Sequence, residues 1–347
     1  MNRQPILAGF AAVACAVALC GCAAGLKAQL SRQTGESVVF IGEGPAALAH
    51  LPSRGRPIQV RTAYQPAPGA AEFVEGRDFV MDYANGTLRR TPHSTLPDFR
   101  KNILFGHEDF DHSKFPGFGN GGFFAFADYS FRKTAGWPSP QANYVKAIHA
   151  RLAGGEAVKI VAFGDSITAG GDATKPELVF WQRWADQLQR YHPSAHVTAV
   201  NGATSGDSTV QGLQRLQAKV LDEQPDLVLI GFGMNDHKKG GVAIPQFEEN
   251  LRQMIDRIRD ATHAEIVLFS AFPPNPKWHY GSHHMQDYAV ATERVARETV
   301  CAYADVFGNW QAFAARKKPE DLLGNNINHP NDFGHWIYWR TLSAMGL

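Results

Sequence analysis

The chain of 347 residues has little cysteine and no excess of charge of either sign. Three of its four cysteines lie within the first 22 residues, which leaves Cys301 alone in the rest and excludes a disulfide framework. The 34 basic and 33 acidic side chains give a formal net charge of +1, which provides no general attraction to nucleic acid. The folded body must therefore be stabilised by packing, and we expect a neutral or small partner.

The amino terminus reads MNRQPILAGFAAVACAVALCGC, with one basic residue followed by an apolar run too short and too rich in alanine for a permanent membrane span. Its end, Leu19-Cys20-Gly21-Cys22, resembles the lipobox of bacterial lipoproteins, in which the cysteine is lipidated and becomes the new amino terminus. By that resemblance residues 1–21 are a signal peptide, Cys22 carries the lipid, and Ala23 favours the outer membrane. The alternative is a plain secretory signal.

The composition and the residue pattern change twice after the signal peptide. Residues 22–35 are small and polar without a sustained period, which is typical of a tether. Over 36–138, short β-rich segments alternate with Gly, Pro and Asn-Gly, which predicts an all-β domain, a sandwich or jelly roll. The run GWPSPQ, at 136–141, marks the boundary to a second domain over 143–347.

This second domain alternates apolar strands, VKIVAF, HVTAVN, DLVLIGF, EIVLFSAF and CAYADVF, with amphipathic segments. We expect helices at about 177–191, 208–223, 245–261 and 284–299. Continuous apolar strands separated by helices predict a parallel sheet that is covered on both faces. In such sheets, functional side chains gather at the carboxyl ends of the strands.

Polar segments follow three of these strands, and a fourth lies in the last loop: GDSIT, NGATSGDST, GFGMND and NHPNDFGHW. Ser166 can act as a nucleophile only if an imidazole accepts its proton and a carboxylate orients that imidazole. Asp332 and His335 are spaced three apart, so the carboxylate can reach the ring if the segment begins a helix. We therefore predict His335 as the base and Asp332 as its acid. His329 precedes Pro330, which favours an extended backbone, and we interpret it as shaping the loop.

Acyl transfer also needs hydrogen-bond donors for the oxyanion of the tetrahedral intermediate. The sequence offers the backbone N–H of Ser166, the backbone N–H of Gly206 and the side-chain amide of Asn235. Glycine lets the backbone approach a reacting carbonyl closely, and asparagine donates without a competing charge.

These motifs look like the four blocks of the SGNH hydrolase superfamily, also called GDSL esterases and lipases: Gly164-Asp165-Ser166-Ile167-Thr168, Gly206, Gly233-Met234-Asn235-Asp236 and Asp332-Phe333-Gly334-His335. The resemblance runs from about residue 157 to the carboxyl terminus. It implies a flavodoxin-like three-layer α/β/α domain with about five parallel strands. It also implies Ser166 as nucleophile, Gly206 and Asn235 as oxyanion donors, and His335 with Asp332 as base and acid. No metal or organic cofactor is implied.

Two further clusters attract a functional interpretation. HEDFDH, residues 107–112, matches no zinc or calcium spacing, and we interpret it as a solvated loop or edge of the β domain. WHYGSHH follows the fourth strand on the rim of the predicted triad. Trp278, His279 and Tyr280 are therefore weak candidates for contacts to a sugar ring, against the alternative that they pack on the last helix.

The sequence favours an exported, lipid-anchored serine esterase that removes small acyl groups, acetyl in the first place, from carbohydrate through an acyl-serine intermediate. The carbohydrate assignment depends on export, on the aromatic rim and on analogy with β modules of some carbohydrate esterases. A lipolytic esterase or thioesterase with the same triad, a cell-wall modifying esterase and a non-catalytic binding lipoprotein stay open as alternatives. The sequence predicts no nucleic-acid partner and no particular oligomeric state.

Overall fold

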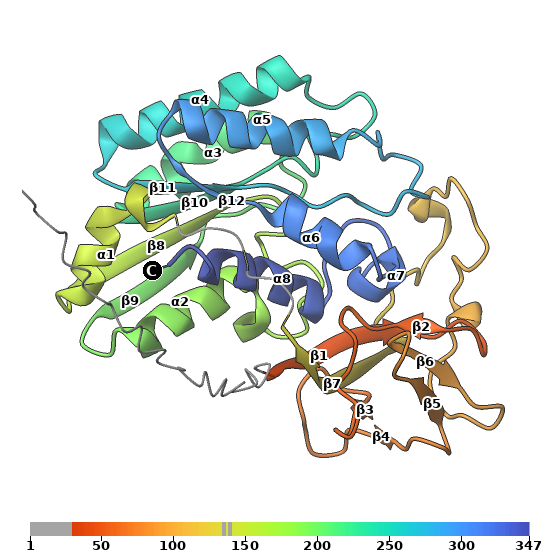
Figure 1. Cartoon of the computed structure of the whole chain (residues 1–347). Coiled ribbons are helices and arrows are strands. Elements are labelled where there is room, and N and C mark those ends of the chain that lie inside the picture. The colour runs from red at the N-terminus through yellow and green to blue at the C-terminus, as the bar shows by residue number, and fades with distance from the viewer. Residues whose placement is uncertain (1–29, 134–136, 138–140, 347) are drawn as a thin grey trace, which may run out of the picture.

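The computed structural model describes residues 30–133, 137 and 141–346 and contains an antiparallel β part followed by an α/β domain (Figure 1). The predicted signal peptide and the predicted lipidation site Cys22 lie outside the described residues. Within those ranges, no helix combines the length and the apolar character that crossing a membrane requires.

The α/β domain is built on a five-stranded sheet in the order β12-β11-β10-β8-β9, and every pairing in it is parallel. Its strands are β8 (Ala157–Gly164), β9 (His196–Asn201), β10 (Leu227–Gly231), β11 (Glu265–Phe269) and β12 (Ala302–Ala304). The predicted flavodoxin-like sheet of about five parallel strands is confirmed. Because β8 lies between β9 and β10, the loops that follow these three strands are neighbours at one edge of the sheet.

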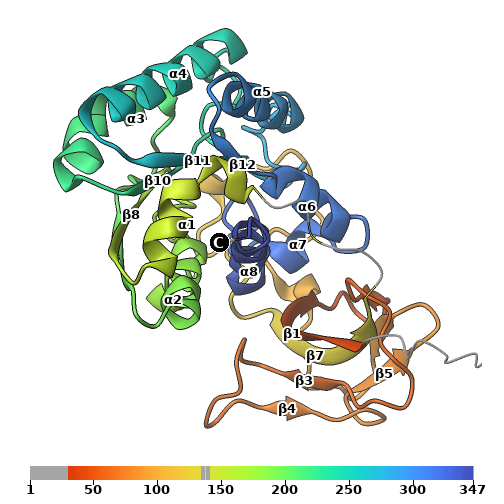
Figure 2. The same cartoon turned by 60° about the vertical axis from the view of Figure 1, so that its left-hand side comes forward.

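Helices cover both faces of the sheet, with α3, α4 and α5 on one side and α1, α2 and α8 on the other (Figure 2). The helices are α1 (Lys146–Ala153), α2 (Phe180–Tyr191), α3 (Thr209–Lys219), α4 (Ile244–Ala261), α5 (Met285–Glu298), α6 (Val306–Ala314), α7 (Pro319–Leu322) and α8 (Asp332–Ser343). The four helices expected from periodicity are all present. The apolar faces of these helices cover the sheet. Isolated helices of this length are marginal in water, so packing against the sheet supplies most of their stability.

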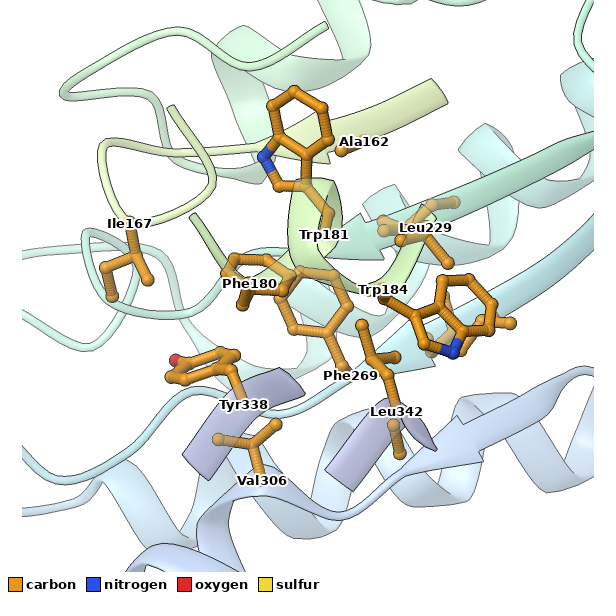
Figure 3. Packing of buried hydrophobic residues seen from close by; sticks show 14 of the residues in the cluster. Ala162, Ile167, Phe180, Trp181, Trp184, Leu229, Phe269, Val306, Tyr338 and Leu342 are labelled. Atoms are coloured by element: carbon orange, nitrogen blue, oxygen red, sulfur yellow. The ribbon is translucent and has the colours of Figure 1, made fainter. Parts of the chain in front are cut away.

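The core between the sheet and helices α2 and α8 is dense with aromatic side chains (Figure 3). The ring centroid of Phe180 on α2 lies 5.3 Å from that of Phe269 on β11 and 4.9 Å from that of Tyr338 on α8. Ile167, directly after Ser166, belongs to the same core and is 2% exposed. Removing apolar surface from water stabilises by about 25 cal/mol per Å², so burial of the Ile167 side chain anchors the turn that carries the serine.

The amino-terminal part consists of a four-stranded sheet, β1-β7-β3-β4, and a three-stranded sheet, β2-β6-β5. Its strands are β1 (Leu30–Val39), β2 (Ala46–Ala47), β3 (Gln59–Arg61), β4 (Glu72–Phe73), β5 (Phe79–Asp82), β6 (Thr87–Arg90) and β7 (Phe124–Arg132). Residues of both sheets, among them Val38, Leu88 and Ala127, share one core. The prediction of an all-β domain is confirmed.

Strand β1 begins at Leu30, inside the segment 22–35 that the sequence predicts to be a tether. Two features hide this strand from pattern recognition. Its register against β7 shifts between Gln33 and Glu36, and Gly35 at the shift has a φ of +64°. A bulge of this kind breaks the alternation by which strands are recognised, and the predicted tether therefore extends into this strand.

The sheet of β1 and β7 is buried on both faces. Val38 and Ala125 face the core of the β domain, whereas Val39, Phe124 and Phe126 belong to the core of the α/β domain. Strand side chains alternate between faces, so a continuous apolar run such as FFAFA indicates a sheet covered on both sides. The β domain is therefore packed tightly against the α/β domain.

Candidate active site

Ser166 lies in a tight turn directly after β8 and is 8% exposed. The Oδ1 atom of Asp165 accepts a hydrogen bond of 2.9 Å from the N–H of Ile167, and the carbonyl of Ser166 accepts one of 2.8 Å from Gly171. Burial raises the pKa of Asp165 to about 7. These bonds fix the backbone on both sides of the serine, so its hydroxyl is presented at the carboxyl edge of the sheet.

The imidazole that meets this hydroxyl belongs to His329. Its Nε2 atom lies 2.9 Å from Ser166 Oγ, and its Nδ1 atom lies 3.0 Å from Oδ2 of Asp172. When Nδ1–H donates to the carboxylate, Nε2 carries the lone pair and can accept the hydroxyl proton. The three side chains thus form a hydrogen-bonded chain in the order that a nucleophile, a base and an orienting acid require.

Asp172 lies six residues after Ser166 on the same loop, with a φ of +58° and a side chain that is 36% exposed. The imidazole of His329 packs directly on this loop. A Cβ added to Gly171 would lie 2.9 Å from Nδ1 of His329, closer than a real Cβ contact allows. Glycine at 171 is therefore required for the close approach of the ring to the serine turn.

The predicted base and acid, His335 and Asp332, do not contact Ser166, and the prediction of His335 as base disagrees with this geometry. The Nε2 atom of His335 donates 3.1 Å to the carbonyl of Gly171, and the residue is fully buried. Asp332 accepts hydrogen bonds from the N–H and Oγ–H of Thr174, at 2.8 and 2.7 Å. Burial lowers the pKa of His335 to about 4, so its ring is neutral at pH 7.

The physical reason is the start of α8 at Asp332. Asp332 and His335 both lie in the first turn of this helix, where the ring of His335 packs within 6.0 Å of the ring of Phe180. His329 lies in the polar loop before the helix. The sequence around each histidine distinguishes the buried one from the one in the loop. FGHWIYW, around His335, is apolar on both sides of its histidine, whereas NNINHPN, around His329, is not.

A carboxylate three residues before the histidine, the spacing that suggested Asp332, is not present for His329. Three residues before His329 stands Asn326, whose amide cannot supply a negative charge and whose Nδ2 donates 2.7 Å to the carbonyl of Phe118. The carboxylate comes instead from the glycine-rich segment AGGDATKP after the serine. A motif search by local spacing cannot find it, since Asp172 and His329 are 157 residues apart.

The three predicted oxyanion donors follow three adjacent strands: Ser166 after β8, Gly206 after β9 and Asn235 after β10. The Nδ2 atom of Asn235 donates 2.9 Å to the carbonyl of Asp207, which ties the asparagine to the residue next to Gly206. Gly206 has a φ of +86°, a conformation that favours glycine. The arrangement can present an amide and two backbone N–H groups at the same edge of the sheet.

Of the weak substrate candidates, Trp278 cannot serve as a stacking surface because it is 3% exposed. Its Nε1 donates 3.2 Å to Nδ1 of His112, and its ring packs in a cluster with Phe110 and Ile327. His279 pairs at 3.0 Å with Asp109. Tyr280 is 38% exposed and stays a weak candidate. The segment 107–112 therefore covers Trp278.

No group of three or more His, Cys, Asp or Glu side chains with metal-binding geometry occurs in the part of the chain that the structure describes.

Comparison with known proteins matches residues 162–337, about half of the chain, to the GDSL-like lipase/acylhydrolase family. The chain belongs to this family of ester hydrolases. The matched region begins within β8 and includes Ser166, Asp172, Gly206, Asn235 and His329.

Three relatives place this domain among known proteins. The esterase TesA of Pseudomonas aeruginosa is 31% identical over 151 residues, which are 43% of this chain and 70% of that protein. An acetylxylan esterase of Geobacillus stearothermophilus is 23% identical over 54% of this chain and 92% of its own length. The uncharacterized lipoprotein YqeF of Bacillus subtilis is 31% identical over 29% of this chain and 43% of its own length.

Among solved structures, an acetylxylan esterase of Geobacillus stearothermophilus superposes with a TM-score of 0.48 at 23% identity, covering 55% of this chain and 94% of that one.

Proposed function

We propose that the chain hydrolyses carboxylic esters through an acyl-serine intermediate, with Ser166 as nucleophile, His329 as base and then acid, and Asp172 as the orienting carboxylate. The observation that carries the proposal is the hydrogen-bonded chain from Ser166 Oγ through His329 to Asp172. An isolated serine hydroxyl is a poor nucleophile, and this arrangement supplies the missing acceptor for its proton.

In the first half of the reaction, Ser166 Oγ attacks the carbonyl carbon while its proton moves to His329 Nε2. The N–H groups of Ser166 and Gly206 and the amide of Asn235 donate to the oxyanion. The C–O bond to the alcohol then breaks, and the alcohol leaves with the proton from His329. In the second half, water gives a proton to His329 and attacks the acyl carbon. The bond from that carbon to Ser166 Oγ then breaks, His329 returns the proton to Oγ, and the carboxylic acid leaves.

We propose acetyl and other small acyl groups on carbohydrate as the substrate class. The acetylxylan esterase relative, which aligns over nearly its whole length, supports this choice. So does a cavity of about 580 Å³ between the β domain and the loop of Asp172. The rings of Tyr64 and Phe124 and the side chains of Lys175 and Asp172 line it, a mixture of apolar faces and polar groups that suits a sugar.

We further propose that Cys22 is lipidated after export. The sequence before it and the lipoprotein YqeF among the relatives support this. Incorporation of labelled palmitate into the wild-type chain in a bacterial host, and its loss in Cys22→Ala, is the expected result. Equal labelling of both chains contradicts the assignment.

The experiment that tests the substrate class measures acetate released from acetylated xylan and mannan, beside hydrolysis of nitrophenyl esters of increasing chain length. We expect acetate release and a preference for the acetyl ester, both abolished in Ser166→Ala with the fold intact. A preference for chains of about eight carbons or more would instead identify a lipolytic esterase or thioesterase. Unchanged turnover in Ser166→Ala would overturn the serine mechanism.

A further inference from the structure

A segment of the β domain reaches the loop that carries His329. Residues 99–122 leave the β domain and run along the side of the α/β domain (Figure 1). The N–H of Phe110 donates 2.8 Å to the carbonyl of Lys277, and the N–H of His279 donates 3.0 Å to the carbonyl of Phe110. The segment is thus fixed on the α/β domain by backbone pairing.

Asn120, near the end of this segment, is fully buried and makes three hydrogen bonds to α7 and the residues just after it. Its backbone N–H donates 2.7 Å to the carbonyl of Gly324. Its side-chain Nδ2 donates 2.9 Å to the carbonyl of Leu323 and 3.0 Å to the carbonyl of Glu320. All three acceptors are main-chain oxygens. The backbone N–H and the side-chain amide of Asn120 therefore fix the backbone between Glu320 and Gly324.

Gly324 connects Asn120 to His329 and to Asp172. Its N–H donates 2.9 Å to the carbonyl of His329, which sets the backbone of the histidine. Gly324 also lies close to Asp172. A Cβ added to Gly324 would be only 2.4 Å from the Cβ of Asp172, so the two residues are packed without room for a side chain at 324. The peptide of Gly324 is therefore held by Asn120 and contacts both the base and the acid.

The neighbours of Asn120 reinforce this arrangement. Nδ2 of Asn102 donates 3.1 Å to the carbonyl of Gly119 and 3.4 Å to Oδ1 of Asn120, which fixes the orientation of the Asn120 amide. Asn326 donates 2.7 Å to the carbonyl of Phe118, two residues before Asn120. Both sides of the contact are thus satisfied by amide groups. Asn120→Ala keeps the backbone bond to Gly324 but leaves the carbonyls of Leu323 and Glu320 without their side-chain donor.

We propose that Asn120 is a positioning residue for ester hydrolysis: by fixing the main chain at Glu320 and Leu323, next to Gly324, its side-chain amide holds the His329–Asp172 pair in line with Ser166. The β domain then completes the active site of the α/β domain. The proposal rests on the roles proposed above for His329 and Asp172. A displacement of about 1 Å at a catalytic group costs on the order of a hundredfold in rate, so the loss of this support affects the chemical step more than binding.

The test compares full-length Asn120→Ala with wild type on a nitrophenyl acetate. We expect kcat to fall by about 10- to 100-fold with KM changed by less than about threefold. The matched control is Arg316→Ala, which removes another contact between the domains: the guanidinium of Arg316 donates 2.7 Å to the carbonyl of Leu48 and 2.6 Å to that of Asn85. This control should lower the melting temperature and leave kcat unchanged. Equal losses of kcat in both variants would overturn the proposal.

A double-mutant cycle separates positioning from general destabilisation. If Asn120 acts through the Asp172–His329 pair, Asn120→Ala should lower kcat by less than about twofold when Asp172→Asn is already present. The same fold-loss in both backgrounds contradicts the proposal. If Asp172→Asn alone keeps wild-type kcat, the proposed catalytic pair itself is wrong, a result distinct from failure of Asn120.

Should Asn120→Ala fail to fold, Gly324→Ala tests the same connection from the other side. It keeps the hydrogen bonds of Asn120 and pushes a methyl group against Asp172. We expect a loss of kcat at least as large as that for Asn120→Ala, again absent when Asp172 is replaced. Wild-type kcat in a folded Gly324→Ala would overturn the proposal.

Discussion

The Oγ of Ser166 and the Nε2 of His329 lie 2.9 Å apart although 163 residues separate them in the sequence. His335, only six residues further along, donates its Nε2–H to the carbonyl of Gly171 instead. Helix α8 begins between the two histidines, at Asp332. One histidine thus stands in a loop at the edge of the sheet, where it can exchange a proton with substrate, and the other is enclosed in the core.

This difference predicts opposite behaviour of two histidine variants. His329→Ala removes the proposed proton acceptor, and we expect kcat to fall by about 10³-fold or more with little change in the melting temperature. His335→Gln keeps a donor for Gly171 but disturbs a buried ring site, so it should lower the melting temperature and change kcat by less than about tenfold. Steady-state kinetics and thermal melts of both variants check this. The reverse ranking of kcat would restore His335 as the base.

The carboxylates of Asp172 and Asp332 allow a second comparison between two variants. Asp172→Asn keeps the shape of the side chain but removes the charge that stabilises an imidazolium on His329, and we expect kcat to fall by about 10²- to 10⁴-fold. Asp332→Asn weakens only the hydrogen bonds to Thr174, two residues after Asp172, so its loss should stay below about tenfold. Kinetics on an acetyl ester, with circular dichroism as a control for folding, compare the two. A larger loss in Asp332→Asn would contradict the assignment of the acid.

Much of the fold follows from the sequence because its signals are local. Apolar strands and amphipathic helices have periods that can be read in a window of a few residues, and the parallel sheet follows from their alternation. The same logic predicts that Ser166, Gly206 and Asn235 lie at one edge of the sheet, since each follows a strand and the carboxyl ends of parallel strands share an edge.

The base and the acid that we propose could not be found in this way. Asp332 and His335 satisfy a local spacing, and nothing in that spacing reveals that the start of a helix turns both away from the serine. The pairing of Asp172 with His329 is a tertiary contact with no local pattern. The burial of Trp278 is a tertiary contact as well, because the segment that covers it comes from the other domain.

Replacing Asn235 tests the oxyanion site independently of the histidine. Asn235→Ala removes the side-chain amide proposed to donate to the tetrahedral intermediate, and we expect kcat to fall by about 10²- to 10³-fold while KM changes little, because the donor acts on charge that develops only in the transition state. Kinetics of a folded variant on a short-chain ester measure this. A rise in KM with unchanged kcat would show that Asn235 binds the ground state instead.

The buried His335 makes stability depend on pH in a defined window. Burial lowers its pKa to about 4 in the folded chain, against about 6.5 when unfolded. Between these values the unfolded chain binds a proton that the folded chain does not, so this contribution is fully present above about pH 6.5 and is lost as the pH falls toward 4. The full loss is roughly 3 kcal/mol in the free energy of unfolding.

Asp165 acts in the opposite direction. Burial raises its pKa to about 7, so the folded chain takes up a proton first as the pH falls below that value. A single protein therefore cannot isolate the histidine, but a difference between two proteins can, because Asp165 is common to both. Chemical denaturation of wild type and His335→Gln at pH 7.5 and pH 4.5 should show a smaller acid-induced loss in the variant, by about 1 to 3 kcal/mol. Equal losses would mean that His335 is protonated in the folded chain, which its enclosure between Phe180 and Gly171 should prevent.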